Sequence, residues 1–113
     1  MTDKSNSQNL NAIDVRELND LQKNKVDFLL LDVRDPFEYE ICNLGGKLIP
    51  LKTLPNKLSE LDKNQYIVVH CKCGVRSQQA AEYLRAQGFK KVHNLTGGIM
   101  EWIEKINPSL KKY

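Results

Sequence analysis

The residues most able to do chemistry stand together in one short stretch, HCKCGVRS, at positions 70–77. The β-branched run IVV precedes this stretch, and the sequence QQAAEYL, which favours a helix, follows it. A chain that passes from a strand into a helix over so short a loop must curve, which turns successive backbone N–H groups inward. The start of the helix adds its own free N–H groups and the positive end of its dipole. The stretch therefore predicts an anion-binding loop.

Cys71 is the predicted nucleophile of this loop. Inward-facing amides and nearby cations favour the negative form of sulfur, so its thiol should be acidic. Gly74 permits a backbone geometry that a side chain would obstruct. Lys72 should lie at the rim, where a mobile ammonium group attracts an anionic substrate.

Transfer of a sulfur atom is the chemistry best matched to a single thiolate in a cup of amides. The thiolate of Cys71 would attack the outer sulfur of a donor such as thiosulfate, sulfite would leave, and a persulfide would remain with its terminal sulfur held by N–H groups. A thiol or cyanide would then remove that sulfur. No general base is needed because the thiolate is already deprotonated, and we expect no metal and no organic cofactor.

Two residues of the loop have more than one interpretation. Arg76 would either supply a fixed cation or brace the loop by pairing with a carboxylate, for which Asp32 and Glu38 are the candidates. Cys73 is either a small packing residue or a second thiol that attacks the persulfide or forms a disulfide with Cys71. A disulfide across one intervening residue would be strained and readily reduced.

The segments around the loop alternate between strand and helix patterns. A helix is expected from near Val15 to Lys25, with Asp14 as its N-cap and Glu17 three residues on. Strands are expected at 26–33, 47–51, 65–70 and 91–95. Further helices are expected at 54–61, from the cysteine loop to a C′ glycine at 88, and at 98–106. The last helix should pack through Ile99, Trp102, Ile103 and Ile106. Residues 36–46 should be irregular, with one helical turn.

This alternation predicts an α/β fold. Strands joined through helices form right-handed crossovers and a parallel sheet covered on both faces. Ligands of such sheets bind beyond the carboxyl ends of the strands. The loop after IVVH should therefore lie at the edge of the sheet where binding sites form.

Composition limits the class of protein. The chain has 113 residues, with 41% hydrophobic and 27% charged, which suits one globular domain. We expect a polar tail at 1–10, the domain at 11–107 and a short basic end at 108–113. The 17 basic and 14 acidic residues are spread along the chain, so no nucleic-acid partner is expected.

Location also follows from composition. The longest apolar run, FLLL, is too short to cross a bilayer, and residues 1–11 are polar without the apolar core of a secretory signal. Three cysteines, an odd number, fit a reducing compartment. We expect a cytoplasmic protein with no membrane contact.

The motifs LLLDVRDPFEYEICNLGGKLIPL, IVVHCKCGVRS and NLTGGIMEW together resemble the rhodanese homology domain, from about Val15 to Ile106. The resemblance implies a five-stranded, mostly parallel sheet with helices on both faces, a structural Asp32–Arg34 pair and a persulfide on Cys71. It also implies that the transferred sulfur is bound by the backbone amides of Lys72, Cys73, Gly74, Val75 and Arg76. The variant ICNLGGKLIPL is similar to rhodanese domains appended to enzymes that activate ubiquitin-like sulfur carriers. The implied partners are a small anionic sulfur donor and a sulfur-carrier or cysteine desulfurase protein.

Three other functions compete with this interpretation. Cysteine-dependent phosphatases have a similar loop but place five residues between Cys and Arg, whereas four lie between Cys71 and Arg76. A domain of this shape can also serve as a non-catalytic binding module. A zinc site would need to draw on Cys42, Cys71, Cys73, His70 and His93. That spacing fits no zinc motif, so we interpret the histidines as strand residues with satisfied nitrogens and Cys42 as a buried apolar residue.

Overall fold

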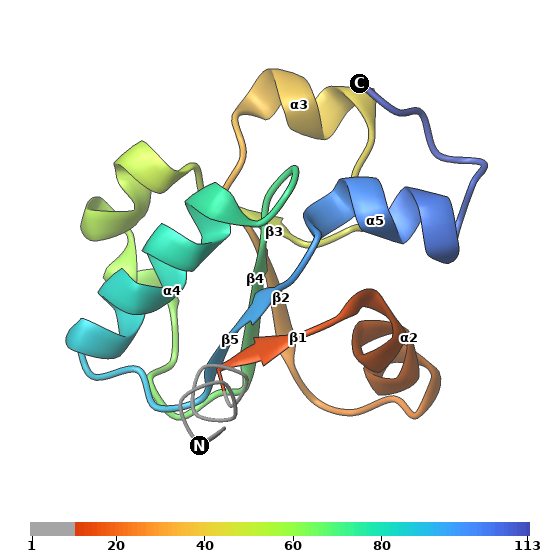
Figure 1. Cartoon of the computed structure of the whole chain (residues 1–113). Coiled ribbons are helices and arrows are strands. Elements are labelled where there is room, and N and C mark those ends of the chain that lie inside the picture. Colours follow the sequence, from red (N-terminus) through yellow and green to blue (C-terminus); the bar gives the residue numbers. More distant parts are fainter. Residues whose placement is uncertain (1–10) are drawn as a thin grey trace, which may run out of the picture.

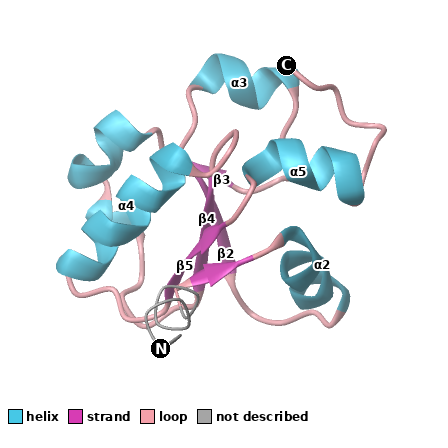
Figure 2. Ribbon diagram, in the orientation of Figure 1, coloured by secondary structure: helices cyan, strands magenta, loops and turns pink. Residues whose placement is uncertain are grey.

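The computed structural model describes residues 11–113, and the polar tail expected at 1–10 lies outside the described residues. Five strands form one sheet in the order β1-β5-β4-β2-β3, and every neighbouring pair is parallel. Figures 1 and 2 show helices on both sides of this sheet. The predicted α/β architecture is confirmed. The sheet is parallel throughout residues 11–113, whereas a mostly parallel sheet was expected.

The elements follow the predicted alternation. The strands are β1 (Ala12–Ile13), β2 (Leu29–Asp32), β3 (Lys47–Leu48), β4 (Ile67–His70) and β5 (Val92–Leu95). The helices are α2 (Val15–Lys23), α3 (Pro36–Ile41), α4 (Val75–Ala86) and α5 (Gly98–Lys105), with two 3₁₀ helices at Leu51–Asn56 and Leu58–Glu60. Within residues 11–113, no helix combines the length and the hydrophobicity needed to cross a membrane.

The central strand β4 is buried on both faces, which explains its continuous apolar sequence. Ile67 and Val69 pack on one side with α4 and the 3₁₀ helices, in a cluster that includes Leu54. Val68 points to the other side, where Leu18 of α2 belongs to the same core cluster. The predicted packing stripe of α5 is confirmed, with Ile99, Trp102 and Ile103 buried and Ile106 packed partly buried beside them.

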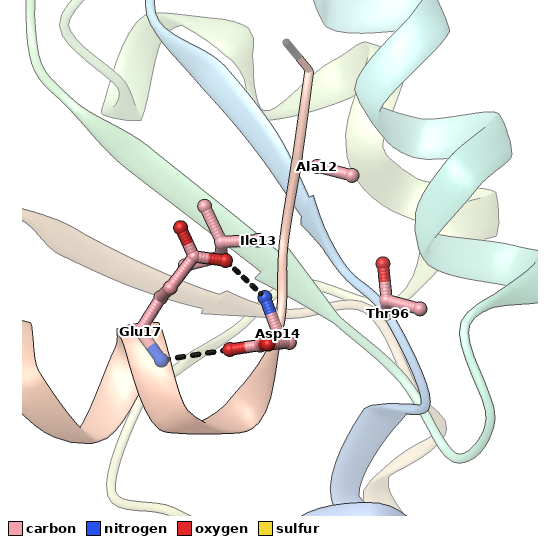
Figure 3. A pocket seen from close by; sticks show the side chains of 5 residues that line it. All are labelled: Ala12, Ile13, Asp14, Glu17 and Thr96. Atoms are coloured by element: carbon pink, nitrogen blue, oxygen red, sulfur yellow. Dashed lines mark hydrogen bonds between the residues drawn. The ribbon is translucent and has the colours of Figure 1, made fainter. Parts of the chain in front are cut away.

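The predicted start of the first helix is also confirmed. Asp14 accepts a hydrogen bond from the backbone N–H of Glu17 at 2.9 Å, and Glu17 Oε1 accepts one from the Asp14 N–H at 3.0 Å. Figure 3 shows this reciprocal pair beside a hollow of about 340 Å³. The hollow is lined by Ala12, Ile13, Asp14, Glu17 and Thr96. It contains no residue of the cysteine loop.

Residues 36–41, in a segment expected to be irregular with one helical turn, form the α-helix α3, and the structure differs from prediction at two further places. The α-helix expected at 54–61 is two 3₁₀ helices, because Pro55 has no N–H to donate and the backbone closes i to i+3 bonds, such as Lys57 N–H to the Leu54 carbonyl at 3.0 Å. Strand β1 was not predicted at all, since two residues are too few to show an alternating pattern. It pairs with β5 at the sheet edge, with Ala12 opposite Asn94.

Candidate active site

Cys71 follows the last residue of β4, at the carboxyl edge of the sheet, and only 1% of its surface is exposed. Its Sγ accepts hydrogen bonds from the backbone N–H of Gly74 at 3.1 Å and of Ser77 at 3.4 Å. The Ser77 hydroxyl lies 3.4 Å from the same sulfur. Donors therefore converge on the sulfur. Ser77 is one of them, although the sequence analysis did not place it among the sulfur-binding residues.

These contacts shift the ionisation of Cys71 in the predicted direction. Burial opposes the charged form and is the largest single influence on its pKa. The hydrogen bonds from the Ser77 hydroxyl and from the N–H groups of Ser77, Gly74 and Cys73 together outweigh burial, so the pKa of the Cys71 thiol is lowered. The thiolate is the reactive form of cysteine.

The shape of the loop depends on Gly74, which precedes α4 with φ at +110°, a conformation that L side chains rarely adopt. Its carbonyl accepts a hydrogen bond from Asn94 Nδ2 at 3.3 Å. The Oδ1 atom of Asn94 accepts a hydrogen bond from the Ser77 hydroxyl. The neighbouring strand β5 thus holds the loop at two points. A hydroxyl has one proton, so Ser77 donates either to Asn94 Oδ1 or to the sulfur, and not to both at once.

The start of α5 holds the other end of the loop. The N–H of Ile99 donates to the Cys71 carbonyl at 3.0 Å, and the N–H of Met100 donates to the Lys72 carbonyl at 3.1 Å. Two of the free N–H groups at this helix terminus are satisfied in this way. A Cβ atom at Gly98 would collide with the Lys72 carbonyl and would lie 2.7 Å from the Cys71 carbonyl oxygen. Only glycine allows α5 to approach so closely.

Arg76 braces the loop from outside. Its Nη1 and Nη2 atoms lie 2.6 and 2.9 Å from the two carboxylate oxygens of Glu38, in α3. Of the two predicted partners, the structure thus selects Glu38. This ion pair, together with hydrogen bonds from the Asp35 N–H and from the Tyr113 hydroxyl, outweighs burial and lowers the pKa of Glu38 to about 2.

A second ion pair, which is fully buried, also contacts α3. Arg34 and Asp32 are fully buried, and Arg34 Nη2 lies 2.8 Å from Asp32 Oδ2, as the predicted structural pair requires. Arg34 also donates to the carbonyls of Glu38 at 3.3 Å and Cys42 at 2.8 Å. The Cys42 side chain is buried, in agreement with its interpretation as an apolar residue.

His70 departs from expectation. It is fully buried at the end of β4, and neither ring nitrogen has a hydrogen-bond partner among residues 11–113. Its Nε2 is 3.6 Å from Asp32 Oδ2, an oxygen that is bound to Arg34. Nδ1 of His93 is also without a partner in this part of the chain. The prediction of satisfied histidine nitrogens is therefore wrong: Asp32 Oδ2 lies beyond hydrogen-bond distance of His70 Nε2 and accepts a hydrogen bond from Arg34 instead.

The outer surface of the loop exposes two side chains. Cys73 is exposed, so its interpretation as a packing residue is wrong, while a reaction with the persulfide stays a prediction. Val75 is 71% exposed and lies on the first turn of α4. All three cysteines are free thiols. Within the described part of the chain, no three His, Cys, Asp or Glu side chains gather closely enough to hold a metal ion.

Tyr113 is a site residue that the sequence analysis missed. Its hydroxyl donates to Glu38 Oε2 at 2.7 Å and accepts from Arg34 Nη1 at 2.9 Å. The Lys72 ammonium lies 4.6 Å from the centre of its ring. A tyrosine at the end of a basic segment carries no pattern that would reveal such contacts.

The fold and the thiol loop agree with a known family. The model of the rhodanese-like domain matches residues 14–105, and the chain belongs to this family. A protein of Staphylococcus aureus whose crystal structure is described as a rhodanese-like domain protein superposes with a TM-score of 0.77 at 30% identity, covering 90% of this chain and 97% of that one. The predicted resemblance is confirmed.

Relatives of known name fall into two groups. A sulfurtransferase of Allochromatium vinosum is 37% identical over 82% of this chain and 88% of its own length. Longer relatives include the Arabidopsis thaliana rhodanese-like/PpiC domain-containing protein 12, chloroplastic (40% identity over 89% of this chain), and the Mycobacterium tuberculosis probable adenylyltransferase/sulfurtransferase MoeZ (37% over 90%). This chain spans only 36% and 27% of their respective lengths.

Proposed function

We propose that this protein is a cytoplasmic sulfurtransferase of the thiosulfate sulfurtransferase type, with Cys71 as nucleophile and persulfide carrier. The observation that carries the proposal is the convergence of the Gly74 and Ser77 N–H groups and the Ser77 hydroxyl on Cys71 Sγ. Donors at this position stabilise negative charge on sulfur before and after transfer. Three free thiols support the reducing cytoplasm as its location.

The first half-reaction loads the enzyme. The Cys71 thiolate attacks the outer sulfur of thiosulfate, a new S–S bond forms, and the bond to the sulfonate sulfur breaks with its electron pair, releasing sulfite. The negative charge passes to the terminal sulfur of the persulfide. We propose that the amides of Lys72, Cys73, Gly74, Val75 and Arg76 bind that sulfur.

The second half-reaction unloads it. A thiolate or cyanide attacks the terminal sulfur, and the electron pair of the breaking S–S bond returns to Cys71 as thiolate, so no oxidant or reductant is consumed. Lys72 and Arg76 would favour anionic donors, with Lys72 the more available because Arg76 is bound to Glu38. A relative named as a putative sulfur carrier protein supports a sulfur-carrier protein as acceptor, and we propose a protein persulfide as the alternative donor.

The test is intact-mass spectrometry after incubation with thiosulfate. We expect the protein to gain one sulfur atom that a reducing agent removes, and we expect Cys71→Ala to gain none. Cys42→Ala is the matched control, because this second buried thiol lies outside the loop, and the variant should still take up sulfur. If wild-type protein takes no sulfur from thiosulfate or from a desulfurase persulfide, the domain is a binding module instead.

A further inference from the structure

The segment after α5 returns to the active-site loop, beyond residue 105, where the match to the family model ends. Leu110 packs against the core on the α5 side of the sheet. Tyr113 packs partly buried on the cluster that contains Cys42, Ile99 and Ile103. These apolar contacts fix the position of the tyrosine ring, and Figure 1 shows the C-terminal end of the chain next to α3.

The hydroxyl of Tyr113 fixes the orientation of that ring. It accepts a hydrogen bond from Arg34 at 2.9 Å and donates one to Glu38 at 2.7 Å. Burial, the largest influence, and the neighbouring Glu38 raise the pKa of Tyr113 to about 12 against the opposing effect of Arg34. The hydroxyl therefore keeps its proton and remains a donor at neutral pH. The ring is held at both its edge and its polar tip.

The face of the ring is where the Lys72 ammonium lies, 4.6 Å from the ring centroid. A lysine has a flexible stem of four carbons, and an exposed one samples many positions at a cost in entropy when it is fixed. An aromatic face attracts the ammonium and limits that sampling. The Lys72 backbone is already fixed by the hydrogen bond from Met100, so the ring supplies the remaining restraint on the side chain.

We propose that Tyr113 is a positioning residue, whose ring holds the Lys72 ammonium beside the Cys71 loop so that the site prefers anionic reactants. This rests on the proposed function only in taking Cys71 as the reacting thiol. The polar contacts of Tyr113 are with Arg34, Glu38 and Lys72 rather than with the sulfur, so it acts through Lys72. The segment after α5 thereby contributes to the selectivity of the site.

The experiment compares alkylation of Cys71 by iodoacetate, an anion, and by iodoacetamide, its neutral analogue. Site-resolved mass spectrometry separates Cys71 from the exposed Cys73. The ratio of the two rates at pH 7 reports positive charge at the thiol and requires no sulfur donor. We expect Tyr113→Leu to lower this ratio about threefold, as loss of one exposed cation–π contact predicts. Tyr113→Phe, which keeps the ring, should lower it much less.

A double-mutant cycle separates positioning from general loosening. Lys72→Met should lower the ratio by itself, and adding Tyr113→Leu to Lys72→Met should lower it no further. Tyr66→Leu is the matched control, since Tyr66 stacks on His93 at the opposite end of β4 and should leave the ratio unchanged. An unchanged ratio in Tyr113→Leu, or an equal fall with and without Lys72, would overturn the proposal.

The two proposals fail in distinguishable ways. If neither thiosulfate nor a desulfurase persulfide loads sulfur onto Cys71 while the alkylation ratio responds to Tyr113 through Lys72, the proposed function is wrong and the positioning role stands. If sulfur is loaded but the alkylation ratio does not respond to Tyr113, the positioning role is wrong and the proposed function stands. Where sulfur transfer is measurable, Tyr113→Leu should raise the KM for thiosulfate about threefold and change kcat little.

Discussion

The inner and outer sides of the cysteine loop are built in different ways. The inner side, which faces the sulfur, consists of Gly74 and Ser77, three and six residues after Cys71. The outer side consists of Glu38, Gly98 and Tyr113, and the contact from Arg76 to Glu38 spans 38 residues of sequence. The donors that bind the sulfur are local, whereas the contacts that fix the loop in place come from the whole chain.

This difference separates two properties of the site. Any tight connection from a strand to a helix can direct amides at an anion. Holding those amides still, without reorganisation when charge develops, requires packing from outside. We expect changes on the outer side to alter stability and loop geometry, and changes on the inner side to alter the ionisation of Cys71.

The largest expected effect is that of Gly98→Ala. The added Cβ would strike the backbone carbonyls of Lys72 and Cys71, neither of which is a flexible side chain end. We expect a loss of about 3 kcal/mol in the free energy of unfolding, measured by urea denaturation. Gly45→Ala is the matched control, because Gly45 also has a positive φ of +78° but nothing within 4 Å of its Cβ position.

Gly45→Ala should cost about 1 kcal/mol, the conformational penalty alone. Equal losses in the two variants would show that backbone conformation, and not the close approach of α5 to the loop, sets the cost at Gly98.

The next effect concerns the ion pair of Glu38 with Arg76. The folded state lowers the pKa of Glu38 from 4.5 to about 2, so its contribution to stability is complete above pH 4.5 and is lost as the pH falls toward 2. The contribution is about 2 kcal/mol, allowing for solvent screening at Arg76, whose side chain is 34% exposed. Urea denaturation from pH 7 to 2 should show Glu38→Gln less stable at neutral pH and losing less on acidification.

Glu60→Gln provides the comparison for that series. Glu60 forms two ion pairs with Lys47 and Lys57, but all three side chains are at least 40% exposed. Exposed pairs of this kind contribute little to stability. A pH profile of Glu38→Gln that runs parallel to wild type would mean that the pair with Arg76 does not stabilise the fold.

The smallest effect is expected on the inner side, for Ser77→Ala. Loss of the hydroxyl removes one of the hydrogen bonds that lower the pKa of Cys71, so this pKa should rise and less thiolate should be present at pH 7. Iodoacetamide should react with Cys71 about fivefold more slowly, as loss of one hydrogen bond predicts. The exposed Ser59→Ala is the control. A rate equal to wild type would leave the amides alone responsible for the acidity.

Local features were predictable from the sequence, and long-range features were not. The run IVVH and the following helix reveal both the loop and its nucleophile. The N-cap role of Asp14 is evident from the pattern of Asp14 with Glu17 three residues on. Sequence also offered Glu38 and Asp32 as partners of Arg76, but only the folded chain, which places Glu38 2.6 Å from Arg76, selects between them. Ser77 could have been found, since it lies in the first turn of α4, and its N–H group faces the sulfur.

Other features leave no trace in local sequence. Tyr113 reaches Glu38 across 75 residues, and nothing in its surroundings distinguishes it from an exposed tyrosine. The two-residue strand β1 exists because β5 offers an edge to pair with, not because its own sequence favours a strand. The unsatisfied nitrogens of His70 depend on its placement opposite Asp32, whose Oδ2 is bound to Arg34, and only the assembled sheet determines that placement.

The place of β4 in the sheet has a consequence for how the protein fluctuates. It lies between β5 and β2, hydrogen-bonded on both sides, while the edge strands β1 and β3 have two residues each. Amide hydrogens of β4 should therefore exchange with solvent only through global unfolding, whereas the edges open locally. Local opening of the edge strands would therefore leave the end of β4, which positions Cys71, undisturbed.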